Sequence, residues 1–254
     1  MTALPTRKAE DWRYSDVEAV ASVWPLAAPE RIAVGAGEYV ARTLLQDAAD
    51  DAVIIRDFAV TVGEGATFRA HLLNIGGQLG RVTFDVTLAK GAHFALNAAI
   101  IGGGTQTLEV ITTVRHAEPE ATSQQTVRSV LADHATGSYL GKIAVARDAQ
   151  KTDAAQSVKA MLLDRTATAN AKPELEIFAD DVKCAHGATV GELDKAALFY
   201  CAARGLDPRT ARTLLLQAFI AGLFDDMADE AERERFEEAA LAKLAALNVA
   251  EKIA

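Results

Sequence analysis

The pattern of hydrophobic and polar positions divides the chain into three zones. Residues 1–50 mix short helical and irregular stretches that prolines interrupt. Residues 51–187 contain short runs in which apolar and polar residues alternate, separated by Gly, Asp, Asn and Pro, a pattern typical of strands. Residues 188–254 have the period of helices. The pattern predicts a mainly β core with flanking N-terminal and C-terminal helical regions.

The middle zone predicts short strands without crossover helices. Alternation is clear from Val82 to Leu88, and no helical segment is long enough to connect the strands of a doubly wound sheet. Residues 65–68 (Gly-Ala-Thr-Phe) recur as residues 91–94 (Gly-Ala-His-Phe), a shift of 26 residues. Such a repeat indicates a solenoid, but periodicity alone favours an antiparallel sandwich or barrel equally. We place Thr83 and Asn97 among the inward-facing positions.

Three helices are expected in the last zone. Asp194 caps the first helix, which ends before Gly205, and Asp207 with Pro208 starts the second. The third covers about residues 229–247. The second helix has an apolar face, which either covers the end of the β zone or docks a partner. This face comprises Leu214, Leu215, Ala218, Phe219 and Leu223.

Composition and charge narrow the class of partner. The chain has 254 residues, half of them hydrophobic, and a formal net charge of −9. Because nucleic acids and anionic membranes attract basic surfaces, neither is an expected partner. No apolar run approaches the roughly 20 residues that span a bilayer, and the first residues lack the apolar segment of a secretory signal. We therefore expect a cytoplasmic protein whose two cysteines stay reduced.

Cys184 and His186 are the most informative candidate residues. At positions i and i+2 of a strand, both side chains leave the same face. A thiolate and an imidazole suit a soft or borderline metal such as iron or zinc. Two ligands do not complete a tetrahedral site, and Cys201 lies in an apolar helix, so the other ligands would come from elsewhere, with a second chain as the candidate source. Two packed thiols are the alternative interpretation.

Other candidate chemistry is weak. Asp180 and Asp181 are adjacent, so on a strand they face opposite ways and make a poor acid–base pair. Residues 137–142 (Gly-Ser-Tyr-Leu-Gly-Lys) resemble a phosphate-binding loop, but Ile143 stands where a magnesium-binding Ser or Thr belongs. The chain is not expected to hydrolyse ATP.

Several segments resemble the SufB/SufD family of iron–sulfur cluster assembly proteins. The likeness is dense over about residues 137–224 and thin over residues 30–130. The form Val-Lys-Cys-x-His-Gly at residues 182–187 is more similar to the SufD branch than to the SufB branch. The segments are residues 149–154 (AQKTDA) with Gln156, 172–177 (KPELEI), 179–189 (ADDVKCAHGAT), Gly191-x-Leu193-Asp194, 198–200 (LFY), 204–206 (RGL), 5–7 (PTR) and Glu10-x-Trp12-x-Tyr14.

The resemblance implies a right-handed parallel β-helix and a scaffold role. It implies that the chain pairs with SufB through the β-helices and that the ATPase SufC docks on the C-terminal helices, for which Leu214, Leu215, Phe219 and Leu223 are the candidates. It places His186 in cluster assembly at the SufB interface, as a metal ligand shared with that chain, and gives Cys184 a weaker claim. The isolated chain would hold no stable cofactor, only a transient iron–sulfur cluster with SufB, and could form a homodimer when alone.

Two other function classes compete with the scaffold hypothesis. A β-helix enzyme acting on carbohydrates or acyl groups requires paired carboxylates, a catalytic histidine or tandem hexapeptides, and the sequence has no hexapeptide array. A purely structural solenoid would pack Cys184 and His186 without giving them a role.

Overall fold

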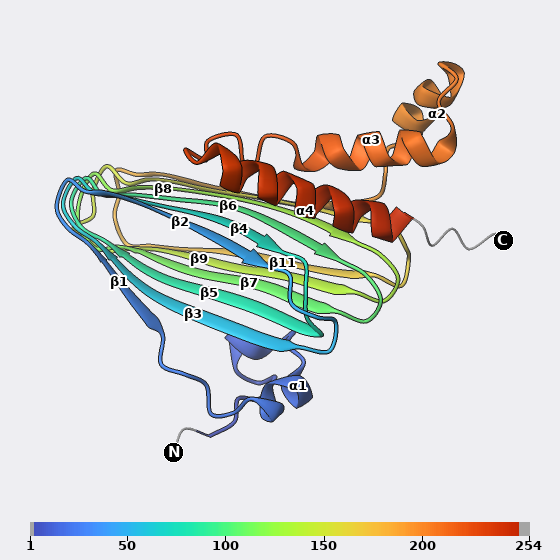
Figure 1. The fold of residues 1–254 in the computed structure, drawn as a ribbon. Coiled ribbons are helices and arrows are strands. Elements are labelled where there is room, and N and C mark those ends of the chain that lie inside the picture. Colours follow the sequence, from blue (N-terminus) through green and yellow to red (C-terminus); the bar gives the residue numbers. More distant parts are fainter. Residues whose placement is uncertain (1–2, 249–254) are drawn as a thin grey trace.

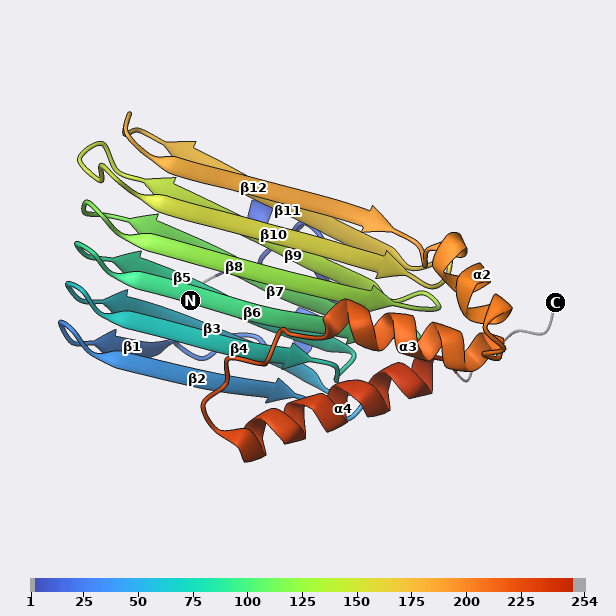
Figure 2. The ribbon, with the colours of Figure 1, turned by 90° about the horizontal axis from the view of Figure 1, so that it is seen from above.

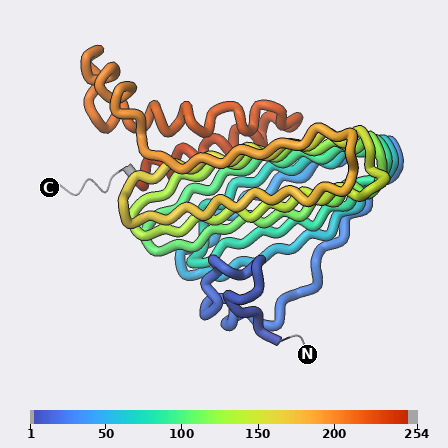
Figure 3. The backbone as a smooth tube through the Cα atoms, turned by 180° about the vertical axis from the view of Figure 1, so that it is seen from behind, coloured from blue at the N-terminus to red at the C-terminus, as the bar shows by residue number. Residues whose placement is uncertain are grey.

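The chain folds as a parallel β-helix. The computed structural model describes residues 3–248, and within them twelve strands form two six-stranded sheets in which every paired neighbour is parallel. Successive strands alternate between the sheets, so the chain winds through six stacked coils (Figures 1 and 3). The solenoid prediction is confirmed, and the parallel pairing excludes an antiparallel sandwich.

The two sheets contain alternate strands of the chain. The first sheet comprises β1 (Glu30–Val34), β3 (Val53–Val62), β5 (Leu79–Leu88), β7 (Thr107–His116), β9 (Thr136–Val145) and β11 (Thr168–Ile177). The second comprises β2 (Tyr39–Gln46), β4 (Thr67–Asn74), β6 (His93–Gly102), β8 (Thr122–Leu131), β10 (Asp153–Leu162) and β12 (Lys183–Gly191). The strands thus begin within the segment 1–50 and extend beyond residue 187.

The 26-residue repeat corresponds to one coil. Phe68 of β4 pairs with Phe94 of β6, and the preceding glycines, Gly65 and Gly91, turn the corner with φ of 62° and 63°. Glycine adopts this left-handed conformation without the steric cost that a side chain adds. Glu120 and Lys151 occupy the same corner in later coils, each with φ of 65°, so the repeat continues where the glycine signal is lost.

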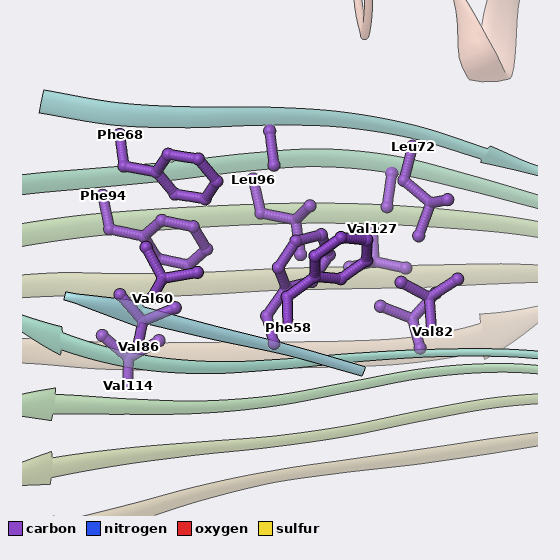
Figure 4. Packing of buried hydrophobic residues seen from close by; sticks show 14 of the residues in the cluster. Phe58, Val60, Phe68, Leu72, Val82, Val86, Phe94, Leu96, Val114 and Val127 are labelled. Atoms are coloured by element: carbon purple, nitrogen blue, oxygen red, sulfur yellow. The ribbon is translucent and has the colours of Figure 1, made fainter. Parts of the chain in front are cut away.

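The core lies between the two sheets (Figure 4). The alternating residues from Val82 to Leu88 are fully buried, and Phe58 stacks on Phe84 with ring centroids 5.1 Å apart. Our placement of Thr83 and Asn97 inside is wrong, because each lies between two buried core neighbours and so faces outward.

The three predicted C-terminal helices form, and the first two begin at their predicted caps. They are α2 (Lys195–Ala203), α3 (Pro208–Ile220) and α4 (Glu230–Asn248). The carboxylates of Asp194, Asp207 and Asp229 accept backbone N–H groups of the helices that follow them. Of the helices in the described part of the chain, none is long and apolar enough to cross a membrane.

Helices α3 and α4 cover the outer face of the second sheet, where they lie across several strands (Figures 1 and 2). Phe236 of α4 is fully buried and meets Phe224 edge to face, with ring centroids 5.2 Å apart. The cluster between helices and sheet contains Leu73, Ile75, Ala99, Ile101, Val130, Leu216, Ile220, Leu223, Phe224, Met227, Phe236, Ala240 and Leu244.

The N-terminal segment, residues 3–29, packs on the outer face of the first sheet. It contains a 3₁₀ turn (Glu10–Trp12) and helix α1 (Val17–Ser22). Beneath it, Arg81 and Glu109 form an ion pair of 2.8 Å. The Ser15 hydroxyl donates to Glu109 over 2.6 Å, and the Arg81 guanidinium lies 3.9 Å from the centroid of the Trp12 ring. The segment therefore seals a charged pair that would otherwise face water.

Candidate functional site at the last coil

Strand β12 forms an open edge of the second sheet. It pairs with β10, so that Cys184 lies beside Ala154 and His186 beside Gln156. Within residues 3–248 no strand pairs with its other side (Figure 2). Its outer backbone N–H and C=O groups are therefore free to pair with another chain.

Cys184 and His186 occupy inward-facing positions of this last coil. Their partners Ala154 and Gln156 are 1% and 3% exposed and line the solenoid interior. Because no coil covers β12, Cys184 is half-buried and His186 is exposed. The prediction that both side chains leave one face is confirmed by this register, and the face is the open end of the interior.

The thiol of Cys184 is less acidic than an ordinary cysteine thiol. Burial raises its pKa, the negative charge of Asp153 raises it further, and a backbone hydrogen bond from Ala154 offsets part of the rise. Binding a metal through this sulfur must therefore release a proton. Cys184 and Cys201 are both free thiols. In the described part of the chain, no three His, Cys, Asp or Glu side chains gather as a metal-binding group.

A buried polar stack, which the sequence pattern did not reveal, lies below His186. It consists of Thr112, Gln125, Tyr139 and Gln156, all at most 3% exposed. Hydrogen bonds join the Tyr139 hydroxyl to Thr112 Oγ1 (3.0 Å), Gln125 Oε1 (3.0 Å) and Gln156 Nε2 (3.2 Å). Polar residues at inward positions of the strands could have indicated the stack. In strands with few large apolar residues, however, the sequence does not distinguish inward from outward polar residues.

The residues expected to dock SufC differ in exposure. Leu214 is 46% exposed, whereas Leu215 and Phe219 are half-buried, and Phe219 packs against the cluster beneath α3. Leu223 is 5% exposed and belongs to that cluster. Leu214 is therefore the candidate with the most surface to offer a partner, while Leu223 holds the helix region on the sheet.

A polar clasp fixes the loop between α3 and α4. The carboxylate of Asp226 contacts Arg69, accepts from His71 Nε2 over 2.7 Å and accepts from Asn97 Nδ2 over 3.2 Å. His71 is 1% exposed. Nothing near His71 in the sequence indicates a partner 155 residues away.

Comparison with known proteins identifies the family. A family model described as "SUF system FeS cluster assembly, SufBD core domain" matches residues 26–219. This chain belongs to the SufBD family. The match includes all twelve strands of the solenoid, the Cys-x-His pair of β12, helix α2 and most of α3. The resemblance stated from the sequence segments is thereby confirmed.

Three curated relatives illustrate the relationship. The chain is 30% identical to the iron–sulfur cluster assembly protein SufD of Escherichia coli (strain K12) over 175 residues, which cover 68% of this chain and 41% of that protein. It is 32% identical over 178 residues to a SufBD family protein of Synechocystis sp., covering 70% and 39%. It is 37% identical over 150 residues to the chloroplastic protein ABCI7 of Arabidopsis thaliana, covering 58% and 31%. The matched region thus spans about two fifths of the first two SufBD relatives.

Proposed function

We propose that this chain is a non-catalytic scaffold subunit of a cytoplasmic SufBCD complex and that it takes part, with SufB and the ATPase SufC, in iron–sulfur cluster assembly and transfer. One observation carries the proposal: Cys184 and His186 share the uncovered face of the last coil, beside a strand edge that is free to pair. Because the chain belongs to a family of iron–sulfur cluster assembly proteins, we assign cluster assembly to this surface.

The pair supplies part of a cluster ligand set. Thiolate and imidazole are the side chains that hold iron in protein-bound clusters. Because Cys184 and His186 provide two donors and an iron in such a cluster takes more, we assign the remaining ligands to SufB, docked at this end. The cluster is cargo in this proposal, held until it passes to a recipient protein.

ATP hydrolysis is assigned to SufC. In this chain, Gly137 and Lys142 of the loop-like segment lie within β9, whereas a phosphate-binding loop opens a helix. SufC would dock on the C-terminal helices, with Leu214 at the contact.

The His186→Ala variant tests the site. It should fold and bind SufB as the wild type does, but form clusters at least about tenfold more slowly, because a ligand is lost. His134→Ala removes another exposed histidine and is the matched control. Iron and sulfide content and the cluster absorbance of the reconstituted complex measure the effect. An unchanged rate in His186→Ala removes this residue from the mechanism.

The docking site requires point variants rather than truncation. Deleting residues 206–254 should abolish SufC binding, but it also uncovers the apolar outer face of the second sheet. Leu214→Asp leaves that cluster covered and should abolish SufC binding if α3 is the docking helix. Tyr39→Asp, at an exposed aromatic residue on β2, is the control. Retained SufC binding by Leu214→Asp would refute the assignment.

A further inference from the structure

Gln125, Gln156 and His186 occupy the same position in three successive strands of the second sheet. Gln125 of β8 pairs with Gln156 of β10, which pairs with His186 of β12. Neighbouring strands lie about 4.8 Å apart, so side chains at paired positions stand directly over one another. Phe68 and Phe94 show the same relation, with stacked rings 6.0 Å apart. The amide of Gln156 therefore lies next to the imidazole position.

The hydrogen bonds of Tyr139 leave the carbonyl oxygen of the Gln156 amide without a donor. The Tyr139 hydroxyl has one proton, which it donates to Gln125 Oε1, so Gln156 must donate its N–H to Tyr139. The carbonyl oxygen of Gln156 is then left buried without a hydrogen-bond partner among the described residues. A buried acceptor without a partner is costly, so a donor nearby is strongly favoured.

We infer that Gln156 is a positioning residue for His186: its amide oxygen accepts the N–H of one imidazole nitrogen and leaves the lone pair of the other nitrogen free for iron. The exposed imidazole of His186 makes no hydrogen bond to residues 3–248 in the uncomplexed chain, so its side chain is free to rotate toward the amide. Metal-binding histidines commonly donate their second ring N–H to such an acceptor, which fixes the tautomer and the ring orientation. The inference rests on the role proposed for His186.

The tautomer of His186 in the whole chain tests this contact directly. Nitrogen-15 NMR of histidine-labelled protein at about pH 8.5, where an ordinary histidine is neutral, distinguishes the two tautomers. His186→Ala identifies the signals among those of the five histidines. One neutral hydrogen bond favours one tautomer about 3- to 10-fold, so Gln156→Leu should change the ratio by that factor. Gln156→Glu keeps acceptor oxygens, and its charge strengthens the hydrogen bond, so the wild-type tautomer should remain the favoured one.

Val158→Ala is the matched control, because it loosens the interior at the next inward position of β10 without removing a hydrogen bond of Gln156 or Tyr139. It should leave the tautomer ratio unchanged. Equal ratios in wild type and Gln156→Leu overturn the inference, and so does an equal change in Val158→Ala, which would indicate general loosening of the interior.

Cluster formation with the partner subunits separates this inference from the proposed function. Gln156→Leu should form clusters about 10- to 100-fold more slowly, the usual effect of losing the residue that orients a metal ligand. A changed tautomer ratio with an unchanged rate would uphold the contact and overturn the positioning role of Gln156, whereas only an unchanged rate in His186→Ala would overturn the role of His186 itself.

Discussion

Replacing Glu109 with leucine should release the N-terminal segment from the solenoid. The substitution leaves the Arg81 guanidinium, whose side chain is 3% exposed, without its carboxylate 2.8 Å away. Breaking a buried pair on one side costs about 3–5 kcal/mol, because an uncompensated charge remains buried. A typical domain is stable by only about 5–15 kcal/mol, so a partly open state in which water reaches the guanidinium becomes lower in free energy than the closed state.

Detachment of the N-terminal segment provides that state. Trp12 and Ser15 seal Arg81, and lifting them off would hydrate the guanidinium while the coils stay intact. The loss in stability is then limited to the free energy with which the segment docks. The free energy of unfolding from a denaturant titration should fall by less than the full buried-charge cost.

Tryptophan fluorescence measures this detachment because both tryptophans of the chain, Trp12 and Trp24, lie in the segment. In Glu109→Leu their emission should shift to longer wavelength and iodide should quench it more strongly, while far-UV circular dichroism keeps the β signal. The double variant Arg81→Leu with Glu109→Leu removes both charges and should restore the stability to near the wild-type value. The reasoning fails if Glu109→Leu has unchanged emission and loses less than about 1 kcal/mol of stability.

Four further predictions test other parts of the structure. At the corner with positive φ, Glu120→Gly should stabilise the chain by up to about 1 kcal/mol, whereas Gly65→Ala should destabilise it by about 1–2 kcal/mol, as measured by thermal unfolding. Burial lowers the pKa of His116 to about 4. The unfolded chain therefore takes up the proton first, so stability present above about pH 6.5 is lost as the pH falls toward 4, and His116→Asn should weaken this pH dependence of unfolding. Cys184 should react slowly with iodoacetamide at about pH 8 because its pKa is raised; mass spectrometry of the Cys201→Ser variant measures the rate. Phe236→Ala should cost about 3–5 kcal/mol and increase hydrogen exchange in α4, because this ring fills the centre of the helix–sheet cluster.

The sequence predicted features whose cause is local. Alternation from Val82 to Leu88 identified buried strand faces, and Asp194 and Asp207 identified helix starts, because pleat and caps depend on near neighbours. The pairing of strands 26 residues apart followed from a visible repeat.

Features that join distant segments were not predictable in this way. Arg81 and Glu109 look like ordinary solvent-facing residues of their strands, and they are buried because the N-terminal segment covers them. Gln125 and Gln156 face inward by register, but polar residues on both faces of their strands hide the alternation. The spacing of Cys184 and His186 identified them as a pair. Their position at the uncovered end of the solenoid depends on the number of coils, which the sequence pattern did not show.

The helices that cross the second sheet change how the coils depend on one another. In a solenoid each coil contacts its immediate neighbours, so loss of order can spread from an end one coil at a time. The cluster beneath α3 and α4 includes Leu73 of β4, Ile101 of β6 and Val130 of β8. Three coils therefore share one set of contacts and should lose structure together. Strand β10 adds only the partly buried Met161 to that cluster and β12 adds no residue, so fraying that starts beside Cys184 and His186 should first be opposed at β10.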